Sequence, residues 1–372
     1  MDKSIYQNNW YYISGRVNIL EGHLLNGAFF EKLLFCNSLP DILAALNPTP
    51  LKAYFNQVKH LYEFEKLLND YYFHHIREIR SYSPDTIIYD FFLIKSDIRD
   101  LKKDVKAVLS GKGINENTRP KVFMNNGEEG TTSLPEIFNA SLSFIEHTVL
   151  QFTQKRDTPP GTVQNEDSPN SPIENVKERF NISFIVDLIL DGAYLRYIED
   201  MCKEVKSEII RIYLTMYYVS KGLAIIQRAI ALKHDMNLLH QYFLAGFDNN
   251  HLFRKLVLNA GQISENNLRE FFVETHCNAS LPDHESLVRI LLSNLFPKIS
   301  FQYEVTADNY LVELIRPVKY IPFGPERVFG YLCGLTTEVF NLKLIIGGKI
   351  NSIENTFLKE RLRKTYREHS AA

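Results

Sequence analysis

The stretch PERVFGYLCGLTTEVFNLKLIIGGK, residues 325–349, holds the clearest structural pattern in this chain of 372 residues. Its apolar residues recur at every third or fourth position: Val328, Leu332, Leu335, Val339, Leu342 and Ile346. That spacing predicts an amphipathic helix with one buried stripe. Pro325 suits the first turn of such a helix, and the pair Gly347-Gly348 followed by Lys349 predicts its end.

Helical patterns extend outward from this stretch over most of the chain. Three more segments carry the same spacing strongly, at residues 10–24, 94–108 and 198–223. Alternation typical of a strand is limited to residues 300–305. The sequence therefore predicts an all-α protein in which residues 198–223 form one long helix.

The composition narrows the class of protein. Hydrophobic residues make up 45% of the chain, which at this length is enough for more than one compact unit. The formal net charge of −2 lacks the basic excess that neutralises phosphates, so we expect no nucleic-acid partner. The four cysteines are widely spaced and form no CxxC pair, which is typical of reduced thiols in a cytoplasmic protein.

No segment has the pattern of a secretion signal or of a membrane span. The first residues are polar, and the most apolar window, residues 214–232, is interrupted by Lys221 and Arg228. We therefore expect a cytoplasmic protein without a transmembrane segment of its own, which reaches a membrane only through a partner or its surface.

The sequence lacks the patterns that carry catalysis. Gly348-Lys349 has neither the preceding glycine nor the following Ser or Thr of a phosphate-binding loop. His74 and Glu78 share a helical face without a third ligand nearby, and residues 276–284 match no standard zinc spacing. We predict no catalytic, cofactor-binding or metal-binding residues. An enzyme that uses His74, Glu78 or residues 276–284 is kept as an alternative.

Three six-residue segments align as copies of one motif: DIRDLK at 97–102, EIIRIY at 208–213 and EVFNLK at 338–343. Each copy has an acidic residue four positions before a central aliphatic residue. An internal triplication explains the alignment. Heptad spacing alone is the other explanation, because any two amphipathic helices align passably. The predicted division is into three similar helical units at residues 1–112, 113–225 and 226–350, followed by a basic tail at residues 351–372.

Two segments stand apart from the helical patterns. Residues 155–175 contain four prolines among Gly, Ser, Asn and Asp, which predicts a flexible surface loop within the second unit. The tail carries five basic residues: Lys359, Arg361, Arg363, Lys364 and Arg367. We favour a solvated terminal helix for it. Contact with anionic lipid headgroups or with an acidic partner is the alternative.

The helix that opens this section also carries a family resemblance. IPFGPERVFGYL (321–332), TEVFNLK (337–343) and GKI (348–350) follow one another in the order G-P-E-x-V-x-x-Y, E-x-x-N-L-K, G-K. This resembles the C-terminal signature of the C subunits of archaeal and bacterial V-type ATPases, the family that includes the d subunit of vacuolar ATPases. YISGRVNILE (12–21) resembles the opening of that family, and residues 97–102 resemble its first internal motif copy, with Asp100 in place of the usual Asn.

The resemblance implies a fold, a function and a set of partners. It implies three similar all-helical units arranged as a funnel, with no catalytic centre and no cofactor. Such a subunit sits on the membrane proteolipid ring and receives the central shaft subunits in its funnel, so that it couples ATP hydrolysis or synthesis to proton or sodium transport. A helical scaffold unrelated to rotary ATPases is the alternative.

The motif residues have expected roles. Val339 and Leu342 should pack in the core. The polar residues of the motif either orient helices against one another, which we favour, or face a partner: Glu338, Asn341 and Lys343 on the last helix, with Asp97, Asp100 and Lys102 at the matching positions of the first copy. Arg16 and Glu21 should form ion pairs on a helix surface, which contribute little each when exposed.

Overall fold

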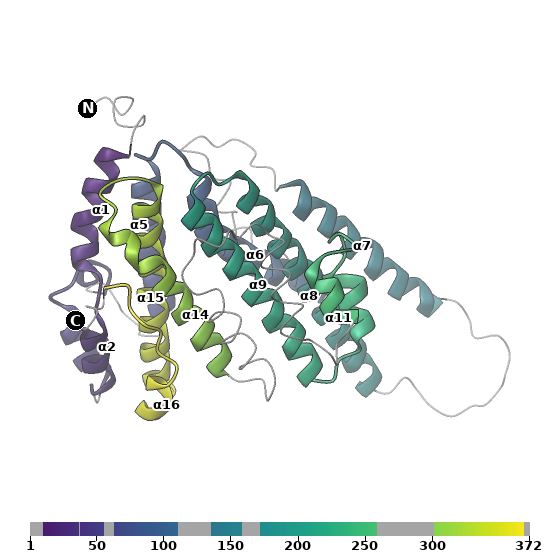
Figure 1. The fold of residues 1–372 in the computed structure, drawn as a ribbon. Coiled ribbons are helices and arrows are strands. Elements are labelled where there is room, and N and C mark those ends of the chain that lie inside the picture. The colour runs from purple at the N-terminus through teal and green to yellow at the C-terminus, as the bar shows by residue number, and fades with distance from the viewer. Residues whose placement is uncertain are drawn as a thin grey trace. The chain divides into compact units, whose positions relative to one another are not determined.

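The computed structural model describes residues 10–36, 38–55, 63–110, 135–157, 172–258 and 301–367. Every regular element within these ranges is helical, which confirms the predicted all-α class (Figure 1). The elements are α1 (Tyr11–His23), α2 (Gly27–Leu34), α3 (Leu39–Leu46), α4 (Lys52–Phe55), α5 (Phe64–Arg80), α6 (Ile87–Leu109), α7 (Glu136–Asp157), α8 (Pro172–Glu204), α9 (Glu208–Ala231), α10 (Met236–Leu238), the π-helical turn η3 (Leu239–Phe243), α11 (Leu252–Leu258), α14 (Phe301–Ile315), the 3-10 turn η4 (Arg316–Tyr320), α15 (Pro325–Ile350) and α16 (Asn355–Lys359).

The chain divides into two compact units. Unit 1 takes its described residues from 1–92, 202–220 and 272–372, and unit 2 takes its own from 93–201 and 221–271. Helices α6, α8 and α9 each contribute residues to both units. Two compact units do not test an internal repeat, so the division into three similar units and the funnel remain predictions.

Helix α15 is the core of unit 1. It packs against α1, α5 and α14, with α1 and α5 beside it in Figure 1. Its predicted stripe is confirmed, because every one of these side chains is buried: Val328, Leu332, Leu335, Val339, Leu342 and Ile346. The 3-4 spacing of the sequence therefore located the central helix of the unit correctly.

The predicted end of α15 is wrong by a turn, because the helix continues through Gly347 and Gly348 to Ile350. A β-carbon at Gly348 would lie 2.4 Å from Cδ2 of Leu358, so this glycine allows α16 to pack closely on α15. The left-handed residue that ends the helix is Ser352, with a φ of 56°.

The strand-like alternation at residues 300–305 is also wrong, because α14 begins at Phe301. The buried side chains of α14 follow helical spacing, as Tyr303, Ala307, Leu311 and Ile315 show. The six-residue window was too short to separate a strand from the first turns of a helix.

The long helix predicted over residues 198–223 is two helices. Helix α8 ends at Glu204 and α9 begins at Glu208. The hydroxyl oxygen of Ser207 accepts a hydrogen bond from the amide of Ile210 at 3.5 Å, which is the position of an N-cap. The buried stripe runs on across the break, since Val205 is buried, and this concealed the break from the periodicity.

The predicted loop at residues 155–175 is wrong at both of its ends. Helix α7 runs to Asp157, and α8 begins at Pro172, which occupies the first helical position tolerated by proline. Both ends of the predicted loop are therefore helical, and residues 158–171 lie outside the described residues.

Candidate functional site

The acidic residue of the α15 motif is buried. Glu338 is only 2% exposed, and its Oε2 accepts a hydrogen bond from the amide of Leu25, between α1 and α2, at 2.5 Å. Its Oε1 accepts another from the hydroxyl of Tyr71 on α5 at 3.1 Å. Burial raises the pKa of Glu338 to about 7. The carboxyl group thus joins three segments that are far apart in the sequence.

The asparagine of the motif is fully buried and binds backbone. The Asn341 side chain donates from Nδ2 to the carbonyl oxygen of Arg363 at 2.9 Å, and its Oδ1 accepts from the amide of the same residue at 2.9 Å. An amide is suited to this pair of bonds because it offers one donor and one acceptor side by side. Asn341 therefore fixes the C-terminal segment against α15.

The lysine of the motif binds α5, the helix that also carries Tyr71. Lys343 donates to Oδ1 of Asn69 on α5 at 2.6 Å, while Val339 and Leu342 are buried as expected. Together the polar motif residues of α15 contact three segments of unit 1: the connection between α1 and α2, helix α5 and the C-terminal segment. These contacts are what helix orientation requires, and they leave contact with a partner as a separate prediction.

The two residues singled out on α1 lie in different environments. Arg16 is partly exposed and pairs with Glu78 of α5, with Nη2 and Oε1 2.7 Å apart. Glu21 is instead largely buried, and it pairs with Arg327 of α15, which also donates to Asn18. Burial raises the pKa of Glu21, and the charge of Arg327 opposes this effect. The surface position expected for Glu21 is therefore wrong.

The first motif copy lies in unit 2 and has different contacts. Lys102 of α6 pairs with Asp191 of α8 at 2.6 Å, and Lys106 pairs with Asp187 at 2.7 Å, so the two helices are joined by a ladder of charges. Burial raises the pKa of Asp191, and Lys102 opposes this effect.

The acidic positions of this first copy also differ from those of α15. Asp97 is buried. Asp100 pairs with Arg99 and Lys103 on its own helix, whereas Asn341 at the matching position binds a distant segment. In both copies the lysine binds a side chain of another helix, Asp191 for Lys102 and Asn69 for Lys343.

The tail is not the solvated terminal helix that we favoured from the sequence. Helix α16 ends at Lys359, and residues 360–367, which we name the C-terminal strap, continue without helix across unit 1. Arg363 pairs with Asp308 of α14 at 2.9 Å. The basic character that predicted a solvated face instead supplies contacts within the unit.

The strap also binds the helices at the start of the chain. Arg367 donates to the carbonyl oxygens of Gly22 at 2.5 Å and Leu24 at 3.0 Å. Tyr366 is buried beside Gly330 and Gly334 of α15, because a β-carbon at either glycine would lie within 3 Å of its side chain. The strap therefore holds α1 to α15.

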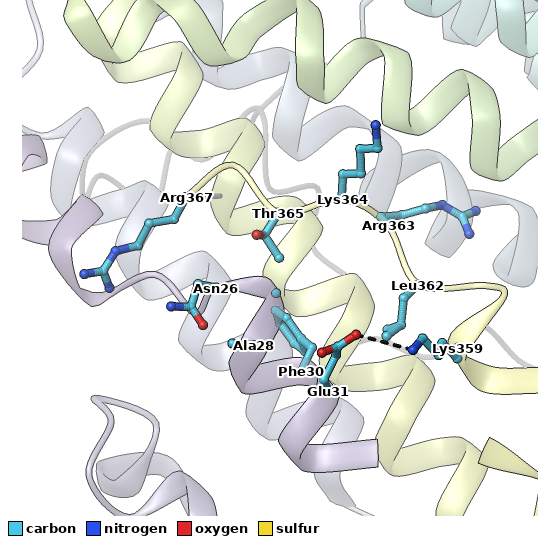
Figure 2. A pocket seen from close by; sticks show the side chains of 11 residues that line it. Asn26, Ala28, Phe30, Glu31, Lys359, Leu362, Arg363, Lys364, Thr365 and Arg367 are labelled. Carbon is cyan, nitrogen blue, oxygen red and sulfur yellow. Dashed lines mark ion pairs between the residues drawn. The ribbon is translucent and has the colours of Figure 1, made fainter. Parts of the chain in front are cut away.

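A groove of about 510 Å³ lies between α2 and the strap (Figure 2). Its four basic residues are engaged within the chain: Lys359 pairs with Glu31 at 3.4 Å, Arg363 with Asp308, Lys364 with Glu313, and Arg367 with backbone carbonyls. Figure 2 shows the side chains of Arg363 and Arg367 leading away from one another along the strap. The groove consequently offers little uncompensated positive charge to an anion.

The histidines considered as ligands also belong to the packing of unit 1. His75 is buried and lies 3.2 Å from the hydroxyl of Tyr331, and burial lowers the pKa of His75 to about 4. His74 contacts the ring of Tyr54 edge-on. Within the described ranges no cluster of three potential metal ligands occurs. Residues 276–284 lie outside those ranges.

Within the part of the chain that the structure describes, two helices are long and apolar enough to cross a membrane by length and composition alone. They are the segments Glu208–Ile230 and Pro325–Ile350, and most of each is buried inside the protein. That burial is the environment of a core helix, since a spanning helix would turn its apolar surface toward lipid.

Four aromatic side chains close in the sequence to the starts of α1 and α15 are exposed: Tyr11, Tyr12, Tyr320 and Phe323. Tyr320 is 75% exposed, and Phe323 is exposed beside Tyr11, with ring centroids 4.6 Å apart. Tyr12 is also exposed, and its ring contacts the ring of Tyr82. Aromatic residues are enriched in protein interfaces, so these rings are the positions at which we test for contact with a partner. We name these five residues the aromatic group.

Some residues of the site were not singled out from the sequence. Arg327 sits beside the apolar stripe of α15, and a charged residue at the edge of a buried stripe was a usable signal. Tyr71 and Asn69 gave no such signal, because their partners lie on a helix more than two hundred residues away.

The described fold is all-helical, and the polar motif residues of α15 bind other segments of the same chain. These two features define the class of protein. Within this class, the chain belongs to the ATP synthase (C/AC39) subunit family, whose model matches residues 13–361. The match confirms the resemblance to the C subunits of V-type ATPases drawn from the sequence. No curated protein matches the chain.

Proposed function

We propose that this chain is a non-catalytic rotor subunit of the central stalk of a V-type ATPase. In this role it links the rotating shaft subunits to the membrane proteolipid ring and couples ATP hydrolysis or synthesis to proton or sodium transport. It lies on the cytoplasmic side, peripheral to the membrane. The observation that carries the proposal is the family match over residues 13–361.

The geometry of unit 1 supports a mechanical role. A subunit that passes on torque must keep its helices in fixed relative positions under load. Glu338, Asn341 and Lys343 bind three different segments from one helix, and the strap adds contacts across the unit. The buried polar contacts among these, those of Glu338 and Asn341, favour one arrangement of the helices over its alternatives.

The test is recovery of the tagged full chain from native membranes in mild detergent, followed by mass spectrometry. We expect the proteolipid ring and the shaft subunits to be recovered in stable stoichiometry. Recovery of neither, from cells with an intact V-type ATPase, would overturn the proposal and favour the unrelated helical scaffold.

A second measurement tests coupling directly. Membranes that lack the chain should lose ATP-driven ion uptake, while the catalytic head still hydrolyses ATP. Restoring the chain should restore uptake. If uptake proceeds at the normal rate without the chain, the linking role is wrong.

A further inference from the structure

The connection between α1 and α2 is held at one amide by a buried carboxyl group. We name residues 24–26 the α1–α2 junction. The amide of Leu25 donates to Oε2 of Glu338 at 2.5 Å, and the side chains of Leu24 and Leu25 are buried. If the junction leaves α15, Glu338 meets water and the two leucines become exposed. The state of the Glu338 carboxyl group is therefore tied to the position of the junction.

Among the described residues, the groups that face Glu338 supply no counter-charge. Tyr71 of α5 donates to its Oε1 at 3.1 Å, and Tyr331 lies two turns earlier on α15 next to His75. Burial, the Leu25 amide and the Tyr71 hydroxyl govern its pKa, and none of these is a charge. Arg367 is the cation at the junction, and it binds the carbonyls of Gly22 and Leu24.

Burial of a carboxylate without a cation disfavours the ionised form, because desolvation is not offset. In the structure both contacts are donated to the carboxyl group, by the Leu25 amide and by the Tyr71 hydroxyl. A neutral carboxyl group keeps both contacts if its own hydroxyl, at Oε1, turns to donate to the Tyr71 oxygen. In the ionised form the two donors partly stabilise the carboxylate, but burial outweighs them because no cation offsets the lost hydration.

We propose that Glu338 is a proton-operated latch on the α1–α2 junction. The neutral carboxyl group holds the junction against α15, and ionisation loosens it. The latch is a property of the isolated chain and goes beyond the proposed rotor function, so its test is independent of whether the rotor assembles.

The direction of the effect follows from the two states of the junction. With the junction closed, the pKa of Glu338 is about 7, and with the junction open we expect it to return toward the ordinary value of 4.5. Between pH 4.5 and 7 the closed state therefore binds more protons than the open state does. Opening should increase with pH across this interval and change little above it.

The experiment is hydrogen exchange of the purified full chain between pH 5 and 8, read by mass spectrometry on peptides that cover residues 20–30. After correction for the intrinsic pH dependence of exchange, we expect the opening constant to rise about 10- to 50-fold from pH 5 to 7 and about twofold from 7 to 8. Glu338→Gln should abolish the rise, because a glutamine keeps both contacts and does not titrate. Peptides from α15 report whether this variant is folded.

Three further variants make the result specific. Tyr71→Phe removes a hydrogen bond that lowers the pKa of Glu338, so it should move the upper limit of the rise to higher pH. Glu78→Gln removes a carboxylate from the partly exposed pair with Arg16 and should leave the rise unchanged. A rise that is absent in the wild type, that persists in Glu338→Gln, or that vanishes only in Glu21→Gln would overturn the latch.

Discussion

The side chain of Asn341 pairs with the backbone of Arg363 through both of its polar atoms, at 2.9 Å each, and the asparagine is completely buried. The side chain of α15 thereby exchanges two hydrogen bonds with the backbone of one residue of the strap, as two residues of paired antiparallel strands do. The pairing explains why the strap stays on α15 without a helix or sheet of its own.

We expect Asn341→Asp to lower the free energy of unfolding by about 2–4 kcal/mol, because it removes the donor to the Arg363 carbonyl and buries a charge. Chemical denaturation of the purified chain measures this. The matched control is Asn351→Asp, which changes an exposed asparagine after α15 that bonds to Gly347 and should cost only about 0.5 kcal/mol. Equal losses in the two variants would contradict the special role of Asn341.

The pH dependence of stability should contain two opposing contributions from unit 1. The pKa of His75 is lowered to about 4 in the folded chain, so His75 binds a proton more readily when the chain is unfolded. The contribution of neutral His75 to the free energy of unfolding is therefore lost as pH falls from 6.5 toward 4. Glu338, with a pKa raised to about 7, acts in the opposite sense, and its contribution is lost as pH rises from 4.5 toward 7.

These contributions can be separated by substitution. In Glu338→Gln the contribution of His75 is no longer opposed by that of Glu338. The free energy of unfolding should therefore increase by up to about 3 kcal/mol between pH 4 and 6.5. In His75→Gln the stability should instead fall as pH rises. Denaturant midpoints at several pH values measure both variants, and identical pH profiles for the two would refute the assignment.

Two glycines of α15 should respond oppositely to alanine. A β-carbon at Gly334 would lie 2.9 Å from atoms of Leu24 and Tyr366, so Gly334→Ala should overpack the contact with the strap and cost about 1–3 kcal/mol. At Gly347 the nearest atom belongs to Phe64 at 3.5 Å, an ordinary contact, so Gly347→Ala should stabilise the helix by about 0.5–1 kcal/mol. Thermal unfolding of both variants is the measurement, and a shared sign would contradict the close approach at Gly334.

Removing one partner of the ion pairs between α6 and α8 should destabilise unit 2. Lys102→Met leaves the partly buried Asp191 without its closest cation and should cost about 1–2 kcal/mol, while Lys103→Met, on the exposed face of the same helix, should cost less than about 0.5 kcal/mol. A double-mutant cycle with Asp191→Asn measures the coupling. A coupling energy near zero would show that the two side chains act independently.

The aromatic group provides a test of partner binding. Tyr320→Ser combined with Phe323→Ser removes two exposed rings and should weaken recovery of partner subunits by at least about tenfold, with the unfolding midpoint unchanged. The control is Phe35→Ser with Phe357→Ser, which removes exposed rings elsewhere on unit 1. Unchanged recovery with the first pair would exclude the aromatic group from the interface.

The sequence predicted the central helix of unit 1 well because its signal is local. The apolar positions from Val328 to Ile346 repeat within one helix, so their spacing suffices to predict burial. The same locality explains the error at residues 198–223, where two helices keep one stripe in phase across Ser207. A serine before an acidic first turn is a start signal that outweighs such continuity.

The contacts of the strap could not be predicted, because they are backbone contacts between distant segments. Arg367 binds carbonyl oxygens at Gly22 and Leu24, which any residue could present. Glu338 likewise binds the amide of Leu25, which carries no mark in the sequence. The motif indicated which residues would orient helices, and only the structure identifies what they bind.

Unit 1 draws its segments from both ends of the chain, and this has a consequence for synthesis. Helices α1 and α5 leave the ribosome long before α15 and the strap exist, so their buried faces have no native partner during most of translation. Unit 2 has all its residues available earlier, and we expect it to acquire its structure first. The buried faces of the early helices therefore stay without their native partner until α15 has been synthesised, and during that interval they are exposed to non-native contacts.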